Sequence, residues 1–96
     1  MFKIVRTEAL TDAIYLMDVE APRVAKNCLP GQFVIVRGSE DGERIPLTIC
    51  DYSREAGTIT IVFQVVGAAT EMMKNLKAGD SFTDFVGPLG RPSELV

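Results

Sequence analysis

Apolar and polar residues alternate most regularly between residues 58 and 66. The odd-numbered positions from Ile59 to Val65 are all apolar, and the even-numbered positions from Thr58 to Gln64 are mostly polar. Side chains of a strand point alternately to its two faces, so this pattern predicts a strand with one face in a core and the other partly wet.

Turn-forming residues divide the rest of the chain into short runs, at intervals typical of a barrel or sandwich. The turn signals are Thr11-Asp12, Leu29-Pro30-Gly31, Glu40-Asp41-Gly42, Ala56-Gly57 and Ala78-Gly79-Asp80. Asp41-Gly42 tolerates positive φ, which favours a hairpin that pairs the third and fourth runs in antiparallel. The predicted strands cover residues 2–9, 13–20, 32–38, 44–51, 58–66 and 81–86.

One helix is predicted, from Thr70 to Lys77. Thr70 is a suitable N-terminal cap, and Gly79 is placed to end the helix. Met72, Met73 and Leu76, with Ala69 before them, give the apolar stripe of a helix that packs on a core. The fold class is therefore all-β with one short helix.

Length and composition restrict the chain to one small domain. It has 96 residues, of which 47% are apolar and 24% charged, as in an ordinary globular protein. The net charge of −3, with no run of lysine or arginine, argues against a nucleic-acid partner. No apolar run approaches the roughly 20 residues that span a bilayer, so no membrane contact is expected.

The absence of histidine and the presence of only two cysteines exclude several chemistries. Cys28 and Cys50 are far apart, so neither a disulfide framework nor an all-cysteine iron–sulfur cluster is indicated, and no metal site is expected. A catalytic triad with histidine is impossible. The chain is expected to be cytoplasmic and to hold a cofactor that performs the chemistry.

The first candidate segment runs from Arg44 to Ile49. Arg44 offers a guanidinium to phosphate oxygens, Leu47 an apolar platform and Thr48 a hydroxyl, a set that suits a flat ring with a phosphate tail. The structural alternative makes Arg44 a solvated charge and Pro46 the mark of an edge strand. It places Leu47 and Ile49 in the core. From spacing alone, this structural alternative is favoured.

A second candidate segment, Val65 to Thr70, passes through Gly67 and small residues into the predicted helix. Backbone N–H groups at a helix start, with the Thr70 hydroxyl, can cradle a phosphate or pyrophosphate. The same residues also suit an ordinary strand-to-helix turn, so the signal is weak by itself. A third segment, Phe85 to Gly90, is favoured as the end of the barrel over a ligand cover.

Taken in order, these segments resemble the flavin domain of the ferredoxin–NADP reductase superfamily, over nearly the whole chain. The likeness is to the branch with the electron-transfer subunit of dihydroorotate dehydrogenase, and more to the small subunit of NADH-dependent ferredoxin–NADP oxidoreductase, also named sulfide dehydrogenase. The segments that carry the resemblance are Pro30-Gly31-Gln32-Phe33-Val34, Glu43-Arg44-Ile45-Pro46-Leu47-Thr48-Ile49, Gly57-Thr58-Ile59-Thr60-Ile61, Val66-Gly67-Ala68-Ala69-Thr70, Gly79-Asp80 and Gly87-Pro88-Leu89-Gly90.

The resemblance implies a six-stranded antiparallel Greek-key β-barrel of the ferredoxin reductase type that binds FAD. In this family pattern Arg44 contacts the phosphate region, and Thr48 lies near the redox-active edge of the flavin as the catalytic residue. The other cofactor-binding residues that it implies are Pro46, Leu47, Phe63 and Val65 around the ring and ribityl chain, and Gly67, Ala68 and Thr70 at the pyrophosphate.

The resemblance also implies partners outside this chain. Residues 1–90 are expected to form the FAD-binding domain, and residues 91–96 to begin a linker to a C-terminal nicotinamide domain. NAD(P) and a two-iron cluster would bind those further parts, with a larger flavoprotein or iron–sulfur subunit and ferredoxin as electron partners. The chain alone would then lack full turnover. The alternative functions are a cofactor-free barrel that binds other molecules and a subunit-docking module.

Overall fold

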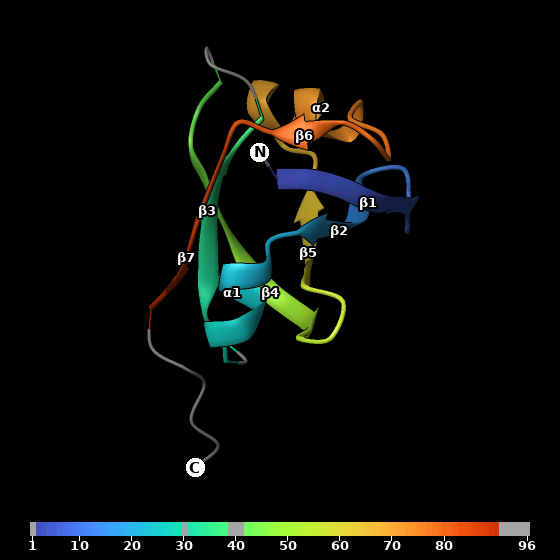
Figure 1. Cartoon of the computed structure of the whole chain (residues 1–96). Helices are drawn as coiled ribbons and strands as arrows, with labels where there is room; N and C mark the ends of the chain where they lie inside the picture. Colours follow the sequence, from blue (N-terminus) through green and yellow to red (C-terminus); the bar gives the residue numbers. More distant parts are fainter. Residues whose placement is uncertain (1, 30, 39–41, 91–96) are drawn as a thin grey trace.

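The computed structural model describes residues 2–29, 31–38 and 42–90 and has one antiparallel sheet that curves into a barrel (Figure 1). Its strand order is β6-β1-β2-β5-β4-β3-β7. Strands β3, β4 and β5 follow one another as hairpins, and β5 then pairs with the earlier strand β2. This arrangement is a Greek key. The predicted architecture of an antiparallel barrel is therefore confirmed.

The first five strands lie where the sequence predicts them, with bounds that differ by two residues at most. The predicted pairing of the third and fourth runs is also observed, since Val36 faces Ile45 and Phe33 faces Thr48. Asp41, half of the predicted turn, lies outside the described residues. The five strands are β1 (Phe2–Ala9), β2 (Ile14–Glu20), β3 (Phe33–Arg37), β4 (Ile45–Ser53) and β5 (Thr58–Gln64).

The sixth predicted strand is two strands in the structure, β6 (Ser81–Phe82) and β7 (Asp84–Leu89). The segment breaks at Thr83 because it changes partners there. β6 pairs with β1 and β7 pairs with β3, while the Thr83 N–H donates to the Arg37 carbonyl at 2.9 Å. Because β6 and β7 are the two edge strands of the sheet, the segment that connects them closes the barrel. The prediction of six strands is corrected to seven.

The prediction of a single helix is wrong, because the chain also forms α1 (Pro22–Asn27) between β2 and β3. This helix has only six residues and turns only Val24 and Ala25 into the core, too little to give a helical apolar pattern in the sequence. The second helix, α2, covers Ala68–Lys74 and so begins two residues before its predicted start. Within the described residues, neither helix has the length and apolar character needed to cross a membrane.

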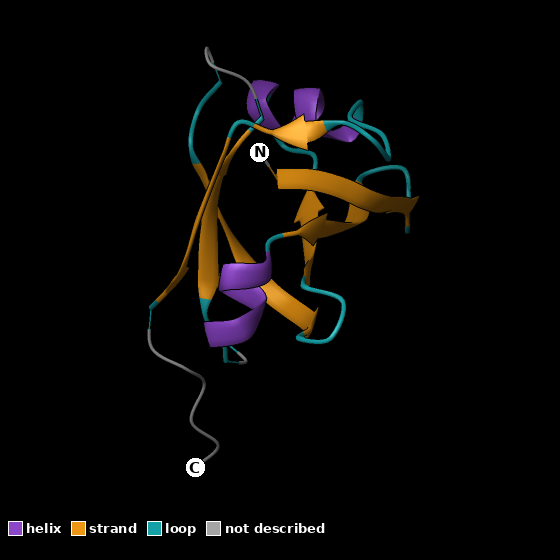
Figure 2. Cartoon of the chain, in the orientation of Figure 1, coloured by secondary structure: helices purple, strands orange, loops and turns teal. Residues whose placement is uncertain are grey.

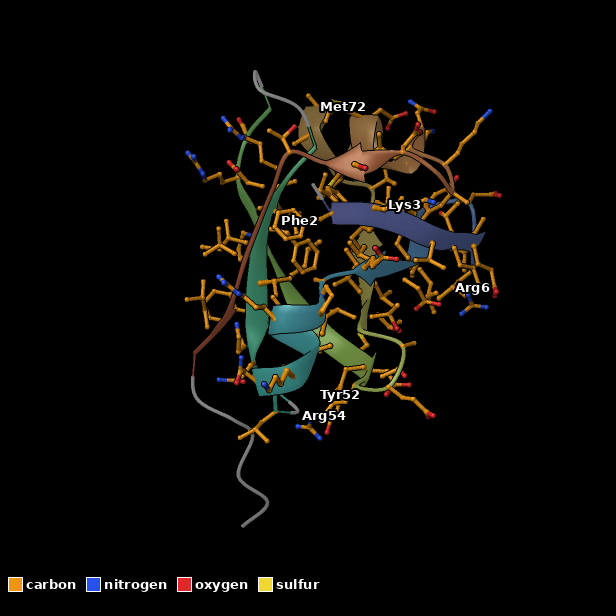
Figure 3. All side chains as sticks on the ribbon, viewed as in Figure 1. Phe2, Lys3, Arg6, Tyr52, Arg54 and Met72 are labelled. Atoms are coloured by element: carbon orange, nitrogen blue, oxygen red, sulfur yellow. The ribbon has the colours of Figure 1, made fainter. Side chains whose placement is uncertain are left out.

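The two helices pack on one core from different ends of the barrel (Figure 2). α1 contributes Val24 and Ala25, and α2 contributes Met73. Gly38 follows β3 directly beneath α2, where a Cβ would lie 2.6 Å from the Met72 side chain that is labelled in Figure 3. The other buried apolar residues are Ile4, Met17, Val19, Ala21, Cys28, Val34, Val36, Leu47, Ile49, Ile59, Ile61, Phe63, Phe82 and Phe85.

Candidate functional site

Strand β4 carries a row of exposed residues on its outer face. Pro46 and Thr48 are exposed, whereas Leu47 and Ile49 between and after them are buried in the core. Arg44, one step before the strand, is exposed like Pro46 and Thr48 and continues the row by alternation. The structure thus brings three predicted site residues to one surface.

Apolar side chains border this row on the neighbouring strand β3. Phe33 lies opposite Thr48, and Ile35 lies opposite Pro46, and both are partly exposed. On the far side of β3, Val86 of β7 lies opposite Ile35 and is 51% exposed. The outer face of these three strands therefore offers an apolar surface with the Thr48 hydroxyl beside it, which suits one side of a flat aromatic ring.

A charged group lies at the end of the row, where the sheet meets α2. Through its Oδ2, Asp84 forms an ion pair with Arg37 at 2.8 Å and accepts a hydrogen bond from Arg44 at 3.3 Å. Arg37 and Asp84 face each other in the pairing of β3 with β7. The Arg44 side chain is 63% exposed, so much of it faces solvent. An anion can reach it from outside the barrel.

The turn into α2 is held by the Thr70 hydroxyl. Its Oγ1 accepts from the N–H groups of Val66 at 2.9 Å and Gly67 at 3.1 Å, and donates to the Gly67 carbonyl at 3.1 Å. Because these bonds occupy the hydroxyl and Thr70 is 7% exposed, its side chain shapes the turn. Ala68 and Ala69 then occupy the first helical positions, whose N–H groups have no partner within a helix.

Gly67 leaves space open at the start of α2. Its φ of −169° is extended backbone that any residue adopts, so the fold does not require glycine there for conformational reasons. A Cβ built on Gly67 would meet no atom within 4 Å. The missing side chain thus keeps clear the space in front of the helix start, which fits a ligand phosphate that approaches the backbone closely.

Three other predicted cofactor-binding residues point inward. Leu47 is 8% exposed and Phe63 is 3% exposed, and Phe63 stacks on Tyr15 with ring centroids 6.0 Å apart. Val65 is partly buried against the core, and its N–H donates to the Ala13 carbonyl at 2.7 Å. These side chains form the barrel wall beneath the outer face, and their contact with a flavin stays a prediction.

The thiols and acids of the described residues form no metal site, since no three metal-binding side chains gather there. Burial raises the pKa of the Cys28 thiol, whereas Cys50 is exposed and lies beyond Thr48 on β4. Near α2, the hydrogen bond from Lys74 to Glu71 raises the pKa of the lysine. The two thiols are unpaired.

Sequence reasoning missed Arg37, Asp84 and the apolar neighbours Phe33 and Ile35. Pairing of β3 with β7 joins segments distant in the chain, and no local pattern encodes which residues such pairing brings together. The available signal was only that Arg37 and Asp84 are charges of opposite sign within two different predicted strands.

The known proteins that this chain resembles are longer than the chain itself. It is 57% identical over 96 residues to a protein of unassigned function from Clostridium beijerinckii, covering all of this chain and 32% of the relative. It is 42% identical over 93 residues to a Thermotoga maritima homologue of the electron transfer subunit of dihydroorotate dehydrogenase B (NAD(+)), covering 97% of this chain and 33% of that protein. No family model matches the chain.

A solved structure of NADH-dependent reduced ferredoxin–NADP oxidoreductase, determined for insight into flavin-based electron bifurcation, has a similar fold and sequence. The TM-score is 0.95 at 41% identity, over 98% of this chain and 34% of that one. The chain therefore spans about a third of the length of the relatives that it matches. Its barrel has the ferredoxin reductase-like fold.

Proposed function

We propose that this chain, a homologue of the electron transfer subunits of dihydroorotate dehydrogenase B, is the FAD-binding domain of an electron-transfer oxidoreductase. The Thermotoga maritima homologue is named for electron transfer, and the similar solved structure belongs to a study of flavin chemistry. The open turn at Gly67, on the α2 side of the barrel, is the observation that carries the proposal.

In this proposal each exposed residue of the site has a separate task. Arg44 binds phosphate oxygens through its exposed guanidinium, and Gly67 and Ala68 offer backbone N–H groups to the pyrophosphate while Thr70 holds their turn. Pro46 supports the flavin ring from the outer face of β4, with Leu47, Phe63 and Val65 as the wall beneath.

Thr48 is proposed as the residue at the reactive edge of the ring. Its exposed hydroxyl lies on the same face as Pro46 and opposite Phe33, so it can donate a hydrogen bond to a ring nitrogen or accept one. Bound FAD supplies the electron transfer itself. Replacement of Thr48 by alanine is expected to alter flavin reactivity more than flavin affinity.

The remaining functions belong to parts of the protein beyond this chain. A longer protein is supported by the relatives, which are about three times as long. We propose that residues 1–90 are the FAD domain, that residues 91–96, outside the described residues, begin a linker, and that a nicotinamide domain follows. NAD(P), a two-iron cluster, a larger flavoprotein subunit and ferredoxin would engage those parts, in the cytoplasm, and the isolated chain would not turn over.

An equilibrium titration of the purified chain with FAD and FMN, followed by flavin fluorescence, tests the proposal. FAD should bind in clear preference to FMN, because only FAD has the pyrophosphate that the turn from Gly67 to Thr70 and Arg44 would engage. Equal affinity for the two flavins would remove the pyrophosphate assignment. Failure of the longer protein to bind either flavin would refute the proposal and favour a cofactor-free docking module.

A further inference from the structure

One carboxylate, that of Asp84, holds two arginines. Its Oδ2 atom forms an ion pair with Nη2 of Arg37 and accepts a hydrogen bond from Nη2 of Arg44. Arg37 and Asp84 face each other in the pairing of β3 with β7. Val36 of β3 faces Ile45 of β4, so the antiparallel register places Arg44, the residue before Ile45, beside Arg37. The three residues form a row across β4, β3 and β7.

The two contacts of Asp84 are unequal. In the ion pair with Arg37, the nitrogen and oxygen are 2.8 Å apart and the Arg37 side chain is 21% exposed, so solvent competes with this contact weakly. The bond to Arg44 is 3.3 Å long, and the Arg44 side chain is 63% exposed. Ion pairs exposed to this degree contribute little, since water screens them and the long side chain loses freedom. The contact with Arg44 therefore breaks more easily than the contact with Arg37.

The same geometry shows what Arg44 offers to a ligand. A guanidinium has five N–H donors in a planar fork, and only Nη2 of Arg44 contacts Asp84. The carboxylate thus keeps the exposed guanidinium at the start of β4 while leaving most of its donors open. It also places a negative charge beside any anion that binds there, and like charges at close range repel.

We propose that Asp84 is the built-in counter-ion of Arg44. It neutralises the guanidinium when no ligand is bound, and the pyrophosphate group of a dinucleotide displaces it from Arg44 while Arg37 retains it. Asp84 is thus a positioning residue that weakens anion binding and makes it reversible. The identity of the dinucleotide as FAD rests on the function proposed above, but the exchange of anions does not.

Calorimetric titration with inorganic pyrophosphate tests the counter-ion directly. Asp84→Asn should bind pyrophosphate about two- to fivefold more tightly than the wild type, because the competing carboxylate is removed. Glu55→Gln removes the same charge from an exposed turn beyond the other end of β4 and should change nothing. Adding Arg44→Gln to Asp84→Asn should abolish the gain. Equal, weaker or undetectable pyrophosphate binding by Asp84→Asn would overturn the proposal.

Wild-type protein gives a second test that does not depend on how the variant folds. Pyrophosphate should shift the side-chain Nε–H resonance of Arg44 in a nitrogen-15 NMR spectrum and leave that of Arg37 in place. Equal shifts, or none, would contradict the exchange. If pyrophosphate shifts the Arg44 resonance but FAD does not bind, only the flavin assignment is refuted. If FAD binds but pyrophosphate does not shift the Arg44 resonance, only the counter-ion role of Asp84 is refuted.

Discussion

Two arginines flank strand β4, and the barrel uses them differently. Arg44, before the strand, makes one 3.3 Å ion pair and is largely exposed. Arg54, after it, donates to the carbonyls of Cys28 at 2.9 Å and Lys26 at 3.4 Å and lies 4.6 Å from the ring centroid of Tyr52 (Figure 3). Arg54 therefore closes the last turn of α1, while Arg44 remains available.

Two glycines follow the same division. Gly57, in the turn between β4 and β5, has a φ of 72°, and a Cβ there would lie 3.3 Å from the Pro22 side chain of α1. Its carbonyl also accepts from the Ala21 N–H at 2.9 Å. Gly67 has extended backbone and open space around its Cβ position. Gly57 is therefore required by the conformation of its turn, whereas Gly67 leaves space that a bound ligand could occupy.

The contrast separates structural residues from residues available to a ligand. At the α1 end, polar groups satisfy the backbone and the helix is tied to the turn after β4. At the α2 end, the guanidinium of Arg44 is exposed, and neither the backbone nor the packing at Gly67 requires glycine. Substitutions at the first end should change stability, and substitutions at the second should change binding.

The largest expected effect is on binding, from Gly67→Val. Its branched side chain should fill the space in front of the helix start and weaken FAD binding by about a hundredfold, since a clash at a phosphate removes several contacts together. The melting temperature should stay within about 1 °C of the wild type, because no neighbour is displaced. Flavin fluorescence and thermal melting measure the two effects. Ala56→Val, in the turn at the other end, is the matched control.

Arg44→Gln should give the next largest loss of FAD affinity, about tenfold, which is the usual contribution of a charge-assisted hydrogen bond. Stability should hardly change, since the ion pair that is lost is exposed. Arg6→Gln is the matched control, because Arg6 of β1 is a similarly exposed arginine that pairs with Glu8 of the same strand and with Asp18 of β2. Equal losses in the two variants would mean that only net charge matters.

Gly57→Ala should destabilise the fold by about 1–2 kcal/mol, the cost of a side chain at positive φ. The short approach to Pro22 adds to this cost. Urea unfolding measures the change, and the FAD affinity of the folded variant should equal that of the wild type. If Gly57→Ala changed FAD affinity but not the free energy of unfolding, it would contradict the proposal that the α1 end is structural and the α2 end binds the ligand.

Arg54→Ala should have the smallest effect, a loss of about 1 kcal/mol of unfolding free energy from two hydrogen bonds that are partly replaced by water. Arg54→Lys should recover only part of that loss, because a lysine lacks the planar fork that reaches two carbonyls. Chemical denaturation with FAD titration of the same samples distinguishes a structural arginine from a ligand-binding one.

The strands were predictable from the sequence because alternation and turn residues are local signals. The row of Pro46 and Thr48 follows from the same alternation, and the turn at Gly67 was visible as a small-residue passage into a helix. The predicted start of α2 at Thr70 is two residues late, because threonine suits a cap position, whereas the Thr70 hydroxyl reaches back to Gly67 from within the first turn.

Other features could not be predicted because they depend on distant pairing. The break at Thr83 arises from the change of partner between β1 and β3, and the contact of Asp84 with Arg37 arises from that closure. By contrast, the burial of Leu47 and Ile49 confirms the structural alternative for the segment from Arg44 to Ile49, which places both residues in the core.

Backbone NMR of the nitrogen-15-labelled chain during titration with FAD is the most direct test of the central claim, that the α2 end is the binding end. We expect saturable shifts of the amide signals of Gly67, Ala68 and Thr48, with those of Arg54 and Gly57 unchanged. Shifts confined to the α1 end, or signals that stay in place throughout while the protein remains folded, would contradict it.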